Sequence, residues 1–95
     1  MLLQQIHVDT AFVGTIGLSA TEGLTTTDPR EAFTKELVMA HAHRVILLAD
    51  STKIGMVSFV RFGSVKDADV LVTDGGVAAK DLRAFRKKGI EVVTA

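Results

Sequence analysis

Four consecutive polar residues near the middle of the chain, Asp50, Ser51, Thr52 and Lys53, carry groups that could contact an anionic ligand. They directly follow an apolar run at residues 45–49, which is typical of a strand buried on both faces of a parallel sheet. Open α/β sheets bind their ligands at the carboxyl ends of such strands. Lys53 could therefore pair with a phosphate or a carboxylate. The alternatives are a solvated Lys53 and an Asp50 that caps the following turn.

Two further predicted strands also end in residues suited to a ligand site. Gly14 closes a strand at residues 10–13, and Asp74 closes one at residues 69–73. Because parallel strands end at the same edge of a sheet, the three ends are expected to lie together, and together they predict a ligand site. Gly14 and Gly17 also resemble a fragment of a phosphate-binding loop, although a tight turn explains both glycines equally well.

The remaining elements complete an α/β fold with an open, mainly parallel sheet and flanking helices. Asp28 and Pro29 begin the clearest helix, with Glu31 at capping-box spacing. The other expectations are a helical tail at residues 1–7, a loop at 15–27, a helix at 28–42, an edge strand at 57–62, a turn at 64–67, a helix at 78–88 capped by Gly89, and a strand at 90–94.

The helix at residues 28–42 has two apolar stripes and therefore needs partners on two sides. The sheet is one partner. No segment of the chain is an evident second partner, so another subunit is expected and the chain is predicted to form a homo-oligomer. Lys35 lies on the first stripe and follows Glu31 by four residues, which also allows a surface ion pair between the two side chains.

Composition limits the function further. The chain has 95 residues, expected to form one domain, with 11 basic and 11 acidic side chains and no cysteine. The balanced charge gives no support for direct nucleic-acid binding, and the lack of cysteine rules out disulfides and thiolate chemistry. No signal peptide or membrane-spanning run is evident, so a cytoplasmic protein is expected. The three histidines do not form a metal set, and no metal or cofactor is predicted.

Several motifs resemble the C-terminal sensor domain of DeoR-type transcriptional repressors of sugar metabolism. They are D-x-A-F-x-G at residues 9–14, E-G-L-T at 22–25, E-A-x-x-K at 31–35, L-A-D-S-T-K-x-G at 48–55 and T-D at 73–74. Thr52 replaces a serine that is common in the family and keeps the hydroxyl. The resemblance extends over nearly the whole chain, with the motifs in the family's order.

This resemblance implies a domain that binds a phosphorylated sugar or a related metabolite and alters DNA binding by an attached winged helix. The winged helix and the first half of the sensor, which carries a phosphate loop, have no counterpart here. The chain is therefore expected to be a single-domain fragment, the C-terminal part of a sensor. The residues expected to contact the effector are Gly14, Lys35, Asp50, Ser51, Thr52, Lys53 and Asp74.

The implied fold is similar to that of ribose-5-phosphate isomerase and the coenzyme A transferases, which raises the alternative of a sugar-phosphate isomerase. In the isomerases the corresponding helix starts with a glycine-rich stretch and carries a carboxylate base on its first turns, whereas the aligned position here is Lys35. A protonated lysine clamps an anionic ligand more readily than it removes a proton from carbon. A binding module without catalysis is favoured, and a module that only forms oligomers is the third possibility.

Overall fold

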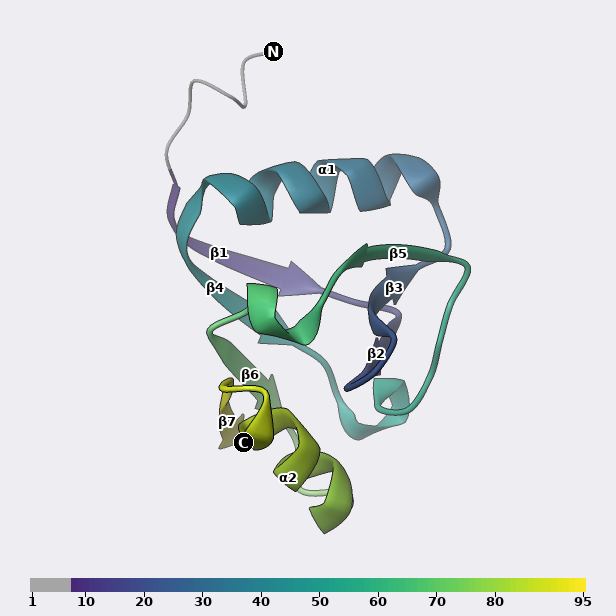
Figure 1. Ribbon diagram of the computed structural model, residues 1–95, viewed down its shortest axis with the longest axis vertical. Helices are drawn as coiled ribbons and strands as arrows, with labels where there is room; N and C mark the ends of the chain where they lie inside the picture. Colours follow the sequence, from purple (N-terminus) through teal and green to yellow (C-terminus); the bar gives the residue numbers. More distant parts are fainter. Residues whose placement is uncertain (1–7) are drawn as a thin grey trace.

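A computed structural model describes residues 8–95, so the predicted helical tail at residues 1–7 lies outside the described residues. Within these residues, seven strands and two helices follow one another (Figure 1). They are β1 (Val8–Gly14), β2 (Gly17–Ser19), β3 (Gly23–Thr26), α1 (Pro29–His41), β4 (Ala42–Leu48), β5 (Val60–Gly63), β6 (Val70–Thr73), α2 (Ala79–Lys87) and β7 (Glu91–Thr94). Two single 3-10 turns lie at Ser51–Lys53 and Val65–Asp67.

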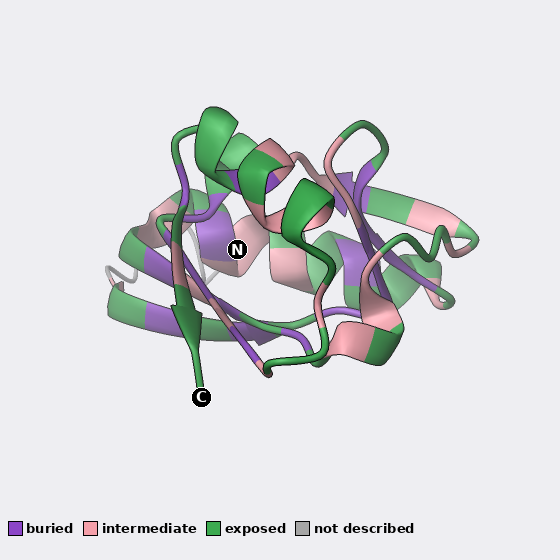
Figure 2. Cartoon of the chain, turned by 90° about the horizontal axis from the view of Figure 1, so that it is seen from below, coloured by how far each residue is buried: buried purple, intermediate pink, exposed green. Residues whose placement is uncertain are grey.

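The main sheet has four parallel strands in the order β1-β4-β6-β7. This confirms the predicted α/β fold with an open parallel sheet. Each connection leads to the next strand in the same direction across the sheet, and right-handed crossovers then place all the connections on one face. Figure 2 shows both helices on the same side of these strands.

The burial of alternate residues agrees with helices on only one face. On β1 and β4, Val13 and Leu47 are paired neighbours and both are buried in the core, together with Phe85 of α2. The next residue on β4, Leu48, points to the other face and is 43% exposed. The core therefore lies between the sheet and its helices, and the opposite face of the sheet is open. The prediction that the run at residues 45–49 is buried on both faces is wrong, because Leu48 faces the open side.

The predicted loop at residues 15–27 is wrong, because this segment contains the antiparallel hairpin of β2 and β3. Its strands are short, and every residue of β3 is buried, so the alternation typical of a half-buried strand is missing. Leu18 and Leu24 are fully buried within it. β5 pairs with β3 at the edge of this small sheet, so the edge strand predicted from residue 57 begins instead at Val60.

Helix α1 begins as predicted, because the Asp28 carboxylate accepts a hydrogen bond of 2.8 Å from the Arg30 amide. Glu31 does not close a capping box; its carboxylate instead accepts a hydrogen bond of 3.4 Å from the Thr26 hydroxyl. The helix contacts β1 and β4 of the main sheet and also β3 and β5 of the small one. The small sheet is thus a second partner that the sequence did not reveal, although Phe33 of α1 remains 56% exposed.

Candidate functional site

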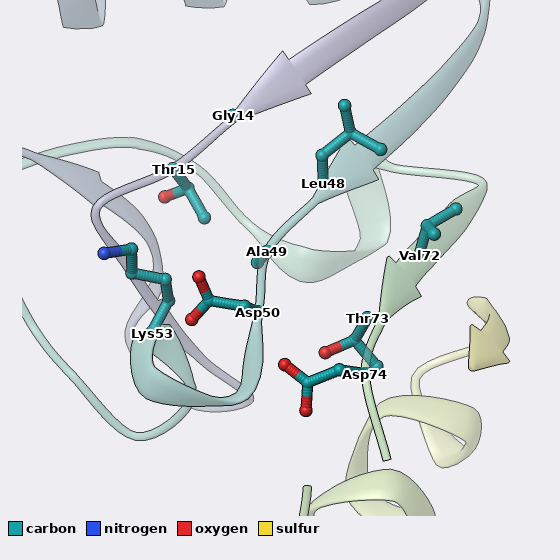
Figure 3. Close-up of a pocket in the computed structure, with 9 residues that line it drawn as sticks. All are labelled: Gly14, Thr15, Leu48, Ala49, Asp50, Lys53, Val72, Thr73 and Asp74. Carbon is teal, nitrogen blue, oxygen red and sulfur yellow. The ribbon is translucent and has the colours of Figure 1, made fainter. Parts of the chain in front are cut away.

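The carboxyl ends of β1, β4 and β6 surround an open cleft of about 420 Å³ (Figure 3). This volume lies within the usual range for small-molecule sites. The prediction that three polar strand ends lie together is therefore confirmed, since residues from all three line the cleft. The cleft is lined by Gly14, Thr15, Leu48, Ala49, Asp50, Lys53, Val72, Thr73 and Asp74.

Asp50 organises the turn that follows β4. Its Oδ1 accepts hydrogen bonds from the amide of Thr52, at 2.9 Å, and from the Thr52 hydroxyl. The bond from the Thr52 hydroxyl, and then the bond from the Thr52 amide, lower the pKa of Asp50 below its ordinary value. The alternative proposed from the sequence, that Asp50 caps its own turn, is correct, and Asp50 lines the cleft as well.

Asp74 connects the ends of two strands. Its Oδ2 accepts a hydrogen bond of 2.9 Å from the Ser51 amide, which follows β4, and its Oδ1 accepts one of 2.7 Å from the Gly76 amide. These bonds from backbone amides, first from Ser51 and then from Gly76, lower the pKa of Asp74. Asp74 is an ionised carboxylate at neutral pH. Its hydrogen bond from the Ser51 amide links the end of β6 to the end of β4 beside the cleft.

Lys53 is the cation of the cleft. Figure 3 shows its side chain extending beside Asp50 toward Thr15. Within residues 8–95, the Lys53 ammonium makes no ion pair and no hydrogen bond to another side chain or to the backbone. That Lys53 pairs with an anionic group of a ligand stays a prediction.

Lys35 lies behind the cleft wall rather than on it. Its ammonium donates a hydrogen bond of 2.7 Å to the carbonyl of Gly14 and lies 5.2 Å from the centre of the Phe62 ring. The surface ion pair with Glu31 that the spacing allowed is not formed in the described part of the chain. Lys35 thus fixes the end of β1, and Gly14 forms the cleft wall in front of it.

A family model described as the DeoR C-terminal sensor domain matches residues 1–75. The chain belongs to this family. The resemblance stated from the sequence motifs is thereby confirmed, and the match includes the strand ends of β1, β4 and β6 that form the cleft.

Several curated relatives of this sensor domain are transcriptional regulators. The chain is 37% identical to the HTH-type transcriptional regulator GlpR of Haloferax volcanii over an alignment of 91 residues, and this alignment covers 96% of the chain and 36% of the relative. It is 35% identical to the HTH-type transcriptional repressor GlcR of Bacillus subtilis over 72 residues, an alignment that covers 76% of the chain and 28% of the relative. It is 30% identical to a putative aga operon transcriptional repressor of Escherichia coli O157:H7 over 91 residues, and here the alignment covers 96% of the chain and 34% of the relative.

The chain therefore spans about a third of the length of the relatives it matches, for example 36% of GlpR. Across residues 8–95, no helix of this sensor domain is long and apolar enough to cross a membrane. The same residues contain no group of three or more side chains that could hold a metal ion.

Of the predicted site residues, four line the cleft, two support it from the turn after β4, and one contacts the end of β1 from helix α1. Gly14, Asp50, Lys53 and Asp74 line the cleft. Ser51 donates its amide to Asp74, Thr52 donates to Asp50, and Lys35 supports Gly14 from behind. Their contact with an effector stays a prediction.

Two threonines that the sequence did not single out also line the cleft, Thr15 and Thr73. Both are buried, with 6% and 4% of their surface exposed. The sequence signals were their position beside Gly14 and Asp74 at strand ends and, for Thr73, the T-D motif at residues 73–74. These signals identify an edge of the sheet but give no hydrogen-bonding role.

Proposed function

We propose that this chain is the effector-binding module of a DeoR-type transcriptional regulator and that its cleft binds a phosphorylated sugar. The observation that carries the proposal is the unpaired Lys53 ammonium in the same cleft as the carboxylates of Asp50 and Asp74. An ammonium favours a phosphate, whereas ionised carboxylates accept hydrogen bonds from hydroxyl groups. A sugar phosphate is a small ligand that presents both kinds of group.

Binding of the effector would alter DNA binding by a helix-turn-helix segment of a regulator, in line with the HTH-type names of the relatives. We place this regulator in the cytoplasm, where phosphorylated sugars are formed. The DNA-binding segment would lie outside the 95 residues of this chain.

We further propose that the cleft does not catalyse a reaction. The position expected for the base of a sugar-phosphate isomerase is Lys35, and its ammonium is directed at the Gly14 carbonyl. A lysine that donates a hydrogen bond in this way is unsuited to accept a proton from carbon. Conversion of ribose 5-phosphate by the purified chain, followed by absorbance or NMR, would contradict this part of the proposal.

The binding proposal is tested by thermal unfolding and calorimetry of the 95-residue chain with a panel of three- to six-carbon sugar phosphates. A ligand at a hundred times its dissociation constant should stabilise the chain by roughly 2.7 kcal/mol. Lys53→Met should abolish most of this stabilisation. Lys66→Met is the matched control, since Lys66 is an exposed lysine that does not line the cleft. If no sugar phosphate stabilises the chain, the proposal is wrong.

A further inference from the structure

One buried hydroxyl in the cleft has no hydrogen-bond partner. Thr73 is 4% exposed, and its Oγ1 is the single buried side-chain nitrogen or oxygen of residues 8–95 without a partner. Buried polar groups in proteins are nearly always hydrogen-bonded, because losing water without a replacement is unfavourable. An exception inside a candidate ligand site therefore calls for a partner that the protein itself does not supply.

The other buried threonines show what the fold does when a hydroxyl has a purely structural role. The Thr15 hydroxyl donates to the carbonyls of Gly17, at 2.7 Å, and Thr25, at 3.0 Å. The Thr25 hydroxyl accepts from the Ser58 amide, and the Thr26 hydroxyl donates to Glu31. Thr73 differs from all three, although Thr15 lines the same cleft.

The surroundings of Thr73 select the chemistry of the missing partner. Figure 3 shows the Thr73 hydroxyl pointing from β6 toward the end of β4, with the carboxylates of Asp50 and Asp74 nearby. Both carboxylates are ionised at neutral pH, and hydrogen bonds from Thr52 to Asp50 and from Ser51 and Gly76 to Asp74 lower their pKa further. A phosphate would be repelled by two carboxylates, whereas a hydroxyl can donate to a carboxylate and also exchange a hydrogen bond with Thr73.

We infer that the Thr73 hydroxyl hydrogen-bonds a hydroxyl of the ligand, so that the uncharged polyol end lies between the ends of β4 and β6. The anionic end then lies at Lys53, on the side of the cleft toward Thr15. This inference rests on the proposed function and adds an orientation of the ligand together with a specificity residue, Thr73. Loss of the hydroxyl should weaken recognition of the polyol and leave recognition of the anion unchanged.

The first test uses no ligand and compares two buried threonines. Thr73→Val replaces an unpaired hydroxyl with a methyl group of similar size, so the melting temperature should stay the same or rise. Thr15→Val removes a hydroxyl with two protein partners, so the melting temperature should fall. A fall for Thr73→Val as large as that for Thr15→Val would overturn the inference, because it would reveal a protein partner for Thr73.

The second test measures affinity by calorimetry for a sugar phosphate that binds the wild-type chain and, separately, for inorganic phosphate. Thr73→Val should weaken the sugar phosphate by about 5- to 10-fold, the usual effect of one neutral hydrogen bond, and Thr73→Ser should restore most of the loss. The affinity of Thr73→Val for inorganic phosphate should equal that of the wild type. Lys53→Met should weaken both ligands.

The outcomes separate this inference from the proposed function. If Thr73→Val binds the sugar phosphate as tightly as the wild type, the inference is wrong and the proposed function stands. An equal loss for sugar phosphate and inorganic phosphate would also overturn the inference, because Thr73 would then contact the anion. If no sugar phosphate binds the wild type, the proposed function fails and this inference fails with it.

Discussion

The two faces of the four-stranded sheet differ sharply, and adjacent residues of β4 show the difference. Leu47 is fully buried under the helices, whereas Leu48, on the opposite face, is 43% exposed. Phe12 on β1 and Val93 on β7 are also exposed, at 66% and 41%. Parallel sheets are usually covered on both faces. The core of this chain therefore lies against one face of the sheet, while the other face leaves apolar side chains exposed.

The largest expected effect tests the covered face. Leu47→Ala should lower the free energy of unfolding by about 3 kcal/mol, because it removes a buried side chain and leaves a cavity in the core. Leu48→Ala, the same change one residue later, should lower it by less than about 1 kcal/mol, since Leu48 is already partly in water. Urea denaturation of the two variants gives both values. Equal losses would mean that the open face is covered in solution.

The second effect concerns the open face and the predicted homo-oligomer. Since the chain has no net charge to oppose self-association, a second copy is the partner that we expect on the face around Phe12. Light scattering of the wild type should show a dimer or a larger species, and Phe12→Lys should shift it toward the monomer. Phe33→Lys is the matched control, because Phe33 of α1 is similarly exposed, at 56%, on another surface.

A monomeric wild type would contradict the predicted oligomer. If Phe33→Lys dissociates the oligomer and Phe12→Lys does not, the contact lies on α1 instead. That result would return the second partner of α1 to another subunit, as its apolar stripes first suggested.

The strands of the main sheet and the edge that carries the cleft could be predicted because their signals are local. The run at residues 45–49 is apolar throughout, Asp74 directly follows β6, and Asp50 lies two residues after β4. The hairpin of β2 and β3 could not be predicted, because glycine and threonine are typical of loops. The partner of the buried Thr25 hydroxyl, the Ser58 amide, lies 33 residues away in the sequence. In this hairpin, tertiary contacts outweigh the intrinsic preference of the residues.

The roles of single side chains were also beyond the sequence. Lys35 was expected to face either a ligand or Glu31, and its contact with the Gly14 carbonyl joins residues 21 positions apart. Thr73 was part of a recognised strand end, but only the surrounding structure reveals that its hydroxyl has no partner. A hydrogen-bond role depends on long-range contacts that no short motif encodes.

The smallest expected effect is a pH dependence that separates the two carboxylates of the cleft. Both have a folded pKa below the ordinary value of 3.8, so each stabilises the fold above that value. This stabilisation is lost as the pH falls from 3.8 through the folded pKa, because the unfolded chain then binds protons more readily. The Asp74 carboxylate, at the end of β6, accepts a hydrogen bond from the Ser51 amide after β4, whereas the Asp50 carboxylate accepts hydrogen bonds only from Thr52 in its own turn. Asp74→Asn should therefore flatten the fall in the urea midpoint between pH 5 and pH 2.5 more than Asp50→Asn does. A midpoint that falls equally in Asp74→Asn and the wild type would show that the link from Asp74 to Ser51 adds nothing to stability.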